Sequence, residues 1–227
     1  MSLILYGAPL SPFVRKADVV LREKAISFES ESVNILPMPD WFVEISPARK
    51  IPVLRDTSVG AEGPEGTIPD SSAICVFAER LAATPALYPA EAFACGRAVW
   101  FEEWADSELA HAIGLGIFRP IMFPIFSKQE PDLETAKRSW NEKLPPLFDY
   151  LEGALGEGDF LVGEAVSIGD IAVACQLVQL ELVAGLPDAS RWPRVVAFQE
   201  RMTARASFAP TRGICRKIIK QQFDLSG

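Results

Sequence analysis

Residues 3–16, LILYGAPLSPFVRK, decide how the first part of the chain is organised. The apolar run from Leu3 to Tyr6 ends at Gly7, which predicts a short buried strand followed by a turn. Ser11 and Pro12 then predict a helix start. A serine side chain can accept hydrogen bonds from the free N–H groups of a first helical turn, and a proline there has no N–H to leave unpaired.

Helical spacing of apolar residues continues from Val14 to Ala25. We expect the charged residues of this helix to form its polar face: Arg15, Lys16, Arg22, Glu23 and Lys24. Beyond it, the pattern predicts strands, an irregular link between the first and second of them, a Gly-rich loop and a helix capped by an Asp-Ser-Ser sequence. The strands are expected at 26–33, 51–55 and 67–68, the loop at 60–66 and the cap at 70–72.

The composition changes after residues 82–92, where Pro85, Tyr88 and Pro89 indicate a domain boundary. Almost everything beyond this link has helical periodicity. One of these helices starts at Ser167-Ile168-Gly169-Asp170, which has the form of a capping box, and its apolar continuation is typical of a central buried helix. We expect helices over 92–117, 132–155 with a break near the two prolines at 145 and 146, 167–182, 193–204 and 214–221.

Charge and rare residues exclude several classes of function. The 227 residues contain 22 Lys and Arg against 30 Asp and Glu, a net charge of −8, which argues against nucleic acid and anionic membranes as partners. We expect no signal peptide and no membrane span, since charges interrupt the longer apolar stretches. With one histidine, His111, and four scattered cysteines, no metal site is expected. Reduced cysteines in a cytoplasmic protein are the better expectation: Cys75, Cys95, Cys175 and Cys215.

Four groups of residues, taken in order, resemble the cytosolic glutathione S-transferase family. They are Tyr6-Gly7-x-x-x-Ser11-Pro12-Phe13-x-Arg15-Lys16, Ser46-Pro47-x-x-Lys50-Ile51-Pro52-Val53-Leu54, Asp70-Ser71-Ser72-Ala73-Ile74 and Ser167-Ile168-Gly169-Asp170. The resemblance implies an α/β thioredoxin-like domain over 1–84, an all-α domain over 90–227 and a homodimer. Ser-Pro-Phe is most similar to the serine-type classes, such as tau and many bacterial members.

Ser11 has two readings that use the same location. It can be only a helix cap, or, as the resemblance implies, its hydroxyl can also donate a hydrogen bond to the thiolate of glutathione at the helix N-terminus. A thiol with an ordinary pKa of about 8.5 needs that pKa lowered by roughly 2 pH units, about 2.7 kcal/mol, to be ionised at neutral pH. A Ser-His-Asp triad is disfavoured because no Gly-x-Ser-x-Gly surrounds Ser11.

The remaining glutathione contacts come from the resemblance. A cis Pro52 would turn the backbone of Ile51 towards the cysteinyl backbone of glutathione, and Lys50 would face its glycyl carboxylate. Asp70 suits the γ-glutamyl ammonium, and Ser71 suits the neighbouring carboxylate. The full expected set is Ser11, Phe13, Lys50, Ile51, Pro52, Asp70 and Ser71.

Three features depart from the family pattern. Asp70 stands where glutamate is more common, and Met38 stands where the tau class has a basic residue. The loop from Gly60 to Gly66 looks longer than the usual family turn. It is no phosphate loop, because it lacks Lys and Ser/Thr after its glycines and carries two glutamates.

The expected activity is glutathione transfer to a small hydrophobic electrophile, as in detoxification. Phe13, Trp104 and Phe118 are candidates for the electrophile site, although plain core packing explains each of them equally well. Two alternatives keep the fold: a glutathione-dependent isomerase, dehalogenase or ether-cleaving enzyme, and a non-catalytic glutathione-binding or chaperone-like member. A disulfide reductase is disfavoured, because position 11 is not cysteine.

Overall fold

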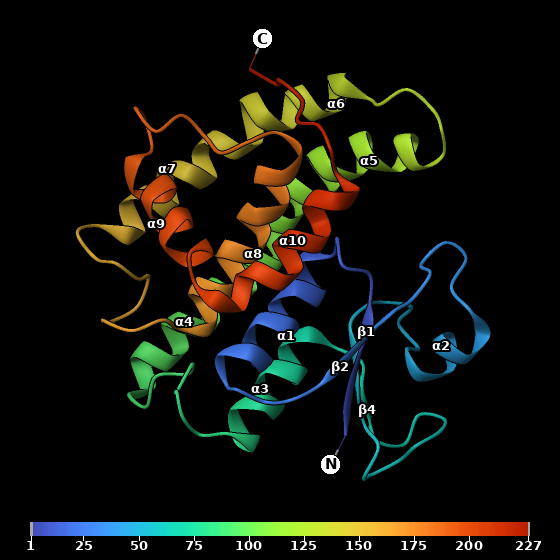
Figure 1. Cartoon of the computed structure of the whole chain (residues 1–227). Helices are drawn as coiled ribbons and strands as arrows, with labels where there is room; N and C mark the ends of the chain where they lie inside the picture. Colours follow the sequence, from blue (N-terminus) through green and yellow to red (C-terminus); the bar gives the residue numbers. More distant parts are fainter. Residues whose placement is uncertain (1, 227) are drawn as a thin grey trace. The chain divides into compact units, whose positions relative to one another are not determined.

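The computed structural model describes residues 2–226. It divides into two compact units, one ending at Leu87 and the other starting at Tyr88 (Figure 1). Each unit has its own secondary structure and core and is described by itself.

The first unit is a small mixed sheet with three helices. Its elements in chain order are β1 (Leu3–Gly7), α1 (Pro12–Glu23), β2 (Glu29–Ser32), α2 (Asp40–Ile45), β3 (Val53–Asp56), β4 (Thr67–Ile68) and α3 (Ser71–Leu81). The strand order is β2-β1-β3-β4. β2 is parallel to β1, whereas β3 is antiparallel to both β1 and β4. This is the thioredoxin-like arrangement that the sequence predicts.

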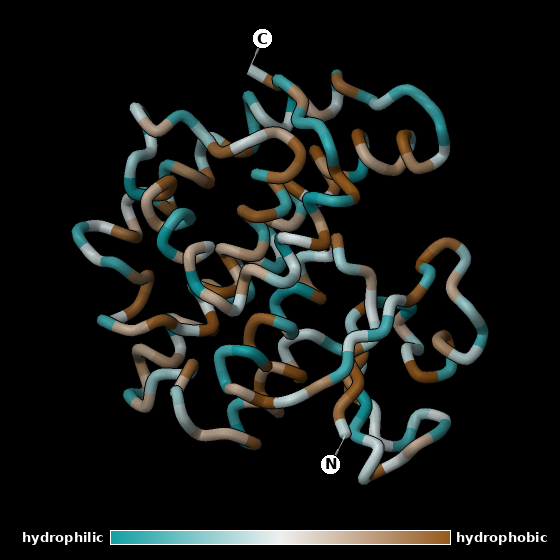
Figure 2. Tube along the Cα trace, in the orientation of Figure 1, coloured by the Kyte–Doolittle hydropathy of each residue, from teal (hydrophilic) through white to brown (hydrophobic). Residues whose placement is uncertain are grey.

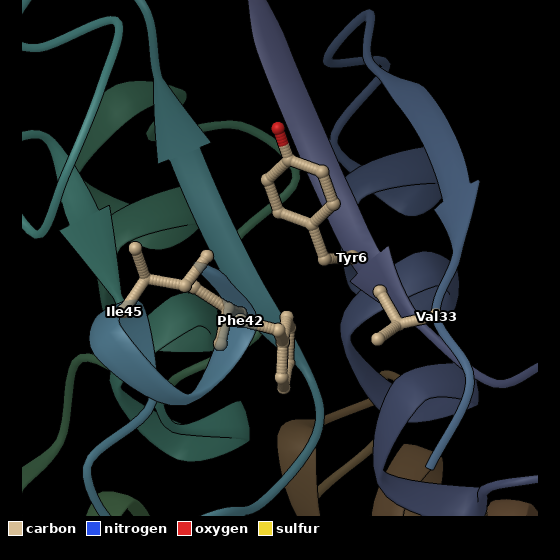
Figure 3. Close-up of a cluster of buried hydrophobic side chains, with 5 residues drawn as sticks. Tyr6, Val33, Phe42 and Ile45 are labelled. Carbon is tan, nitrogen blue, oxygen red and sulfur yellow. The ribbon is translucent and has the colours of Figure 1, made fainter. Parts of the chain in front are cut away.

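Both faces of the sheet are covered, because successive side chains of a strand point to opposite faces. Tyr6 and its cross-strand partner Val53 pack with Phe42 and Ile45 of α2 on one face (Figure 3). Leu5, the residue before Tyr6 in β1, points to the opposite face and is 2% exposed. Figure 2 shows β1 as a hydrophobic stretch, as expected for a strand buried on both sides.

Helices α1 and α3 lie side by side and run in the same direction (Figure 1). Near their starts, Lys16 Nζ of α1 donates a hydrogen bond to Ser72 Oγ of α3 at 2.9 Å. At their ends, Lys24 Nζ forms an ion pair with Glu79 and donates to the carbonyl of Ala82 at 2.8 Å. Since start meets start and end meets end, both N-termini point to the same side of the unit.

The burial of basic side chains on α1 corrects the expectation of a polar face. Arg15, Lys16 and Lys24 were expected on a polar, solvent-facing side of α1, but their exposed fractions are 0%, 1% and 3%. Only Arg22 among the five charged residues is exposed, and it pairs with Asp18 one turn earlier. Long basic side chains bury their aliphatic stems readily, so periodicity alone could not show that this face of α1 is covered.

Two expectations for the segment before β3 also change. The irregular link contains a helix, α2, which is only six residues long and begins after Pro39. One and a half turns are too short for a periodic signal, although Phe42 and Ile45 are spaced as one helical face. The predicted second strand shrinks to four exposed residues at the edge of the sheet.

The second unit is all-helical. Its elements are α4 (Ala92–Trp104), the π-helical η1 (Ala105–Phe118), α5 (Arg119–Phe126), α6 (Leu133–Arg138), the π-helical η2 (Ser139–Lys143), α7 (Leu144–Leu155), α8 (Ile168–Val183), α9 (Pro193–Thr203), the short 3-10 turn η3 (Ala206–Phe208) and α10 (Ala209–Ile218). The prolines at 145 and 146 start α7 after η2, where the backbone passes from one helical form to another without a loop. The last helix begins at Ala209, five residues earlier than expected.

Helix α8 is the core of this unit, as the sequence predicts. Every residue of α8 except Glu181 is buried. Gly169 allows close packing against α4: an added Cβ there would lie 2.8 Å from the carbonyl oxygen of Ala98 and 2.8 Å from Cβ of Phe101. The α4–α8 contact therefore requires glycine at this position.

One prediction about membrane spans needs correction. Among the described residues, the continuous helical stretch Ala92–Phe126 is long and apolar enough to cross a membrane by length and composition alone. Core helices pass the same test, and Phe101, Leu109 and Ile113 of this stretch are fully buried within the structure. The charges within this stretch, Arg119 among them, thus do not interrupt it enough to fail that test, contrary to the expectation from the sequence.

Candidate functional site

Three segments of the first unit meet at one edge of the sheet. Tyr6 pairs with Val53 at the end of β1 and the start of β3, and Leu54 pairs with Ile68 at the end of β4. Antiparallel pairing places the segment that follows β1, the segment that precedes β3 and the segment that follows β4 at the same edge. These segments carry Ser11, then Lys50, Ile51 and Pro52, then Asp70 and Ser71.

Ser11 caps α1 from a half-buried position. Its Oγ accepts a hydrogen bond from Val14 N at 3.3 Å, and its own N–H donates to the carbonyl of Ala8 at 3.0 Å. A hydroxyl that accepts one hydrogen bond still has its proton to donate. Gly7 lets α1 approach this closely, because a Cβ at position 7 would collide with Val14. Ser11 can thus cap the helix and donate to an anion beside it.

The loop before β3 is held by a residue to which the sequence analysis gave no role. Ser46 is fully buried; its Oγ donates to the carbonyl of Lys50 at 2.7 Å and accepts from Lys50 N at 3.1 Å. This pair of bonds fixes the turn that delivers Ile51 and Pro52 to the sheet edge, and the Ile51–Pro52 peptide is cis. Lys50 itself is exposed, as is Arg49.

Asp70 and Ser71 start α3. Asp70 Oδ1 accepts a hydrogen bond from Ala73 N at 2.9 Å, which makes Asp70 the N-cap. Its second oxygen can still accept from a cation, because a carboxylate has about four acceptor sites. Ser71 is the first helical residue and is 6% exposed. Its N–H is one of the four that a helix start leaves without an intrahelical partner.

The site therefore contains two helix N-termini of the same orientation. Each carries partial positive charge, equivalent to roughly half an elementary charge. The buried Lys16 Nζ of α1 donates a hydrogen bond to Ser72 Oγ in the first turn of α3. Anionic groups at these two helix N-termini would meet favourable electrostatics, although the whole chain carries a net charge of −8.

The electrophile candidates are divided between the two units. Phe13 is half-buried in the first turn of α1. Trp104 is 6% exposed and packs against Tyr150 of α7 at a ring-centroid distance of 5.1 Å. Phe118 is 7% exposed and meets Phe123 edge to face. Trp104 and Phe118 thus have packing roles inside the helical unit.

The loop from Gly60 to Gly66 is organised around one arginine of β3. The buried Arg55 guanidinium donates to the carbonyls of Gly60, Gly63 and Glu65 at 2.9, 2.7 and 3.0 Å. Gly66 has a φ of +70°, and a Cβ there would lie 2.6 Å from the carbonyl oxygen of Asp56. These hydrogen bonds make the loop a folded part of the domain.

The remaining candidates for reactive side chains are the cysteines and His111. Among residues 2–226, the cysteines form no disulfide, and no three His, Cys, Asp or Glu side chains gather as metal ligands would. His111 is exposed on η1, where its Nδ1 lies 2.7 Å from the carbonyl oxygen of Ser107.

Comparisons with known proteins agree with this architecture. Residues 5–86 match the family description "Glutathione S-transferase, N-terminal domain", and residues 98–201 match "Glutathione S-transferase, C-terminal domain". The "Uncharacterized GST-like protein YibF" of Escherichia coli is 32% identical over 91% of this chain and 96% of its own. The chain belongs to the glutathione S-transferase family.

Two further comparisons show how widely this family resemblance extends. The "Probable glutathione S-transferase DHAR1, cytosolic" of rice (Oryza sativa subsp. japonica) is 26% identical over 92% of this chain and 86% of its own. The crystal structure of a glutathione S-transferase from Rhodospirillum rubrum F11 superimposes with a TM-score of 0.82, at 22% identity, over 92% of this chain and 91% of that one. The fold is thus shared at sequence identities that are too low to carry a substrate assignment from one protein to another.

Proposed function

We propose that this family member is a serine-type glutathione transferase in which Ser11 donates a hydrogen bond to the glutathione thiolate. The observation that carries the proposal is the convergence of the Ser11, Ile51–Pro52 and Asp70–Ser71 segments at one sheet edge. The thiolate attacks an electrophilic carbon: a new carbon–sulfur bond forms, and either a leaving group departs with the electron pair or the pair moves onto the electrophile and is then protonated.

The size of the edge supports a tripeptide ligand. From β1 across β3 to β4 there are two strand spacings, about 10 Å in total. An extended tripeptide has a similar length, about 10 Å at 3.3–3.6 Å per residue. The main chain of Ile51, just outside the β1–β3 ladder, would pair with the central residue in the manner of an added strand.

The charges at the edge support the assignment of the ends. The γ-glutamyl carboxylate would bind the Ser71 N–H and the Ser71 hydroxyl at the start of α3, and its ammonium would face the Asp70 carboxylate. Lys50, exposed at the turn held by Ser46, would face the glycyl carboxylate. Phe13, in the first turn of α1, would contact the ligand beside the thiolate.

The proposed oligomeric state, cellular location and second substrate are taken from the family. We expect a homodimer in the cytoplasm, and one relative bears "cytosolic" in its name. The second substrate would be a small hydrophobic electrophile, with Phe13, Trp104 and Phe118 as candidates for contact with it. A panel of aryl halides, epoxides, α,β-unsaturated carbonyls and aryl ethers would separate general conjugation from isomerisation, dehalogenation or ether cleavage.

The test compares wild type with Ser11→Ala. Glutathione bound to wild type should titrate well below the ordinary thiol pKa of about 8.5, as followed by thiolate absorbance. Ser11→Ala should raise that pKa and lower kcat/KM near pH 6.5 by about 10- to 100-fold, since a hydrogen bond to a charged group contributes about 1.5–3 kcal/mol. Ser11→Thr, which keeps the hydroxyl and the cap, is the matched control.

Two outcomes would contradict the proposal. Glutathione that fails to bind wild type, or binds with an unaltered thiol pKa, would remove the transferase assignment. A Ser11→Ala variant with an unchanged thiol pKa would leave Ser11 as a helix cap only.

A further inference from the structure

Ser46 is a fully buried serine between α2 and β3. Its Oγ donates to the carbonyl of Lys50 at 2.7 Å and accepts from Lys50 N at 3.1 Å. Its own N–H donates to the carbonyl of Phe42, a core residue of α2, at 2.9 Å. Ser46 therefore connects the main chain just before Ile51 to the packed core of the first unit.

The turn from Ser46 to Lys50 contains a residue in an unfavourable backbone conformation. Arg49 has a φ of +53°, in the left-handed region that residues other than glycine seldom adopt. A conformation of this kind persists where the surrounding structure holds it. Arg49 N donates to the carbonyl of Ser46 at 2.8 Å, and the two bonds between Ser46 and Lys50 close the turn. The main chain thus reaches Ile51 from a fixed direction.

The Lys50 carbonyl determines where the next N–H points. A trans peptide group is planar, and its C=O and N–H point in opposite directions. The Lys50–Ile51 peptide is trans, because the cis peptides among residues 2–226 lie elsewhere in the chain. The Ile51 N–H therefore points away from the carbonyl that Ser46 holds, and away from the buried Ser46 hydroxyl.

The Ile51 N–H has no hydrogen-bond acceptor within the part of the chain that the structure describes. Ile51 is half-buried and lies two residues outside the β1–β3 ladder, which ends at the Tyr6–Val53 pair. Main-chain N–H groups in such surroundings are usually paired. A free N–H of fixed direction is a donor for a ligand at this sheet edge.

We propose that Ser46 is a positioning residue for glutathione and acts through the Lys50–Ile51 peptide. This inference rests on the proposed function, in which the main chain of Ile51 pairs with the central residue of the ligand. Because Ser46 holds the Lys50 carbonyl, the Ile51 N–H is oriented before the ligand arrives and donates to the cysteinyl carbonyl of glutathione. The ligand then does not have to order the turn, and the cost of that ordering is removed from binding.

The test compares Ser46→Ala with the matched control Ser139→Ala. Ser139 is 2% exposed, and its Oγ also donates to a main-chain carbonyl, that of Ala112, at 2.8 Å. It belongs to the second unit and to none of the three segments at the sheet edge. Each variant loses a buried hydrogen bond of the same kind, so both should lower the unfolding temperature.

Only Ser46→Ala should change the affinity for glutathione. Its Kd should rise by about 5- to 10-fold in calorimetry, the range that one hydrogen bond between neutral groups supports. Ser139→Ala should leave the Kd within about twofold of wild type. If both variants raise the Kd equally, the effect comes from lost stability, and the positioning role is wrong.

The thiol of bound glutathione distinguishes the role of Ser46 from that of Ser11. Ser11 and the start of α1 are unchanged in Ser46→Ala, so the pKa of the bound thiol should stay as low as in wild type. Ser11→Ala, in contrast, should raise that pKa. A Ser46→Ala variant that raises the thiol pKa as much as Ser11→Ala does would show a general disturbance of the site and overturn the inference.

A glutathione analogue with CH₂ in place of the cysteinyl carbonyl tests the Ile51 contact itself. It has no acceptor for the Ile51 N–H, so wild type should bind it more weakly than glutathione. Ser46→Ala should show a smaller difference between the two ligands, because the change in the protein and the change in the ligand remove one interaction. Equal differences for the two proteins would mean that Ser46 does not act through Ile51.

Failure of this inference differs from failure of the proposed function. If Ser46→Ala does not fold, Ser46→Cys, with a similar volume and a weak donor, replaces it and should raise the Kd in the same direction. If wild type binds glutathione with a lowered thiol pKa and responds to Ser11→Ala, but the Ser46 variant keeps the wild-type Kd, the positioning role is wrong and the transferase assignment stands. If wild type binds no glutathione, the site itself is misassigned.

Discussion

The starts of α8 and α3 both use an aspartate, and they differ in what surrounds it. At α8, Asp170 is 0% exposed and accepts three hydrogen bonds, from Leu161 N at 2.8 Å, Ser167 N at 2.8 Å and Ser167 Oγ at 2.7 Å. At α3, Asp70 is exposed and accepts from Ala73 N. A closed cap satisfies the chain's own donors, whereas an open cap leaves capacity for a ligand.

The same kind of helix cap thus serves stability where it is closed and can serve ligand binding where it is open. The closed cap ties the start of α8 to the preceding loop and serves the core of the second unit. The open caps at Ser11 and Asp70 lie at the sheet edge of the first unit. Replacement by asparagine should therefore lower the free energy of unfolding at Asp170 and the affinity for glutathione at Asp70.

The largest effect is expected for Asp170→Asn. An amide has one oxygen that accepts, so at least one buried N–H or O–H now paired with Asp170 would lose its partner. The expected loss in the free energy of unfolding is about 3 kcal/mol, measured by urea unfolding. Glutathione affinity of the folded protein should stay unchanged. A stability within about 0.5 kcal/mol of wild type would show that the cap is dispensable.

Asp70→Asn should do the reverse. Asparagine caps helices as well as aspartate, so the unfolding free energy should change by less than about 0.5 kcal/mol. The charge that faces the γ-glutamyl ammonium is lost, and the Kd for glutathione should rise by about 10-fold, as measured by calorimetry. An unchanged Kd would mean that Asp70 only caps α3.

The smallest effect is a pH dependence at Asp170. Burial raises the pKa of this carboxyl above its ordinary value of 3.8, and the hydrogen bonds from Leu161 and Ser167 oppose the rise. The folded state therefore binds the proton more tightly than the unfolded state. The stability that this proton adds is present in acid and is lost as the pH rises through the raised pKa.

The measurement is the difference in unfolding free energy between wild type and Asp170→Asn, followed from about pH 4 upwards. The gap should narrow with rising pH, by up to about 1.4 kcal/mol for each pH unit by which the pKa is raised. A gap that widens instead would show that the three hydrogen bonds outweigh burial.

Much of this was predictable from the sequence, because its signals are local. Gly7, Ser11 and Pro12 specify a strand end and a helix start through the properties of those residue types alone. The Ser167–Asp170 spacing specifies a capping box for the same reason, and the buried character of α8 follows from an apolar pattern with no polar face. The candidate ligand residues came from the order of four motifs.

The features that the sequence analysis missed have a different cause, because each depends on contacts with other residues of the folded chain. Helix α2 is too short to show a period, so its existence depends on Phe42 and Ile45 having Tyr6 and Val53 to pack against. Ser46 carries no local signal for the two bonds that it makes with Lys50. The Gly60–Gly66 loop owes its shape to Arg55 on the neighbouring strand.

The sequence by itself determined the kind of each helix start, the change from mixed to helical structure and the family. Only the tertiary structure decided which charges are buried and which caps remain open. The physical reason is that burial belongs to the surroundings of a side chain: Lys16 and Arg22 lie on one helix with similar local sequence, but only Lys16 lies beneath a neighbouring helix, where it contacts Ser72.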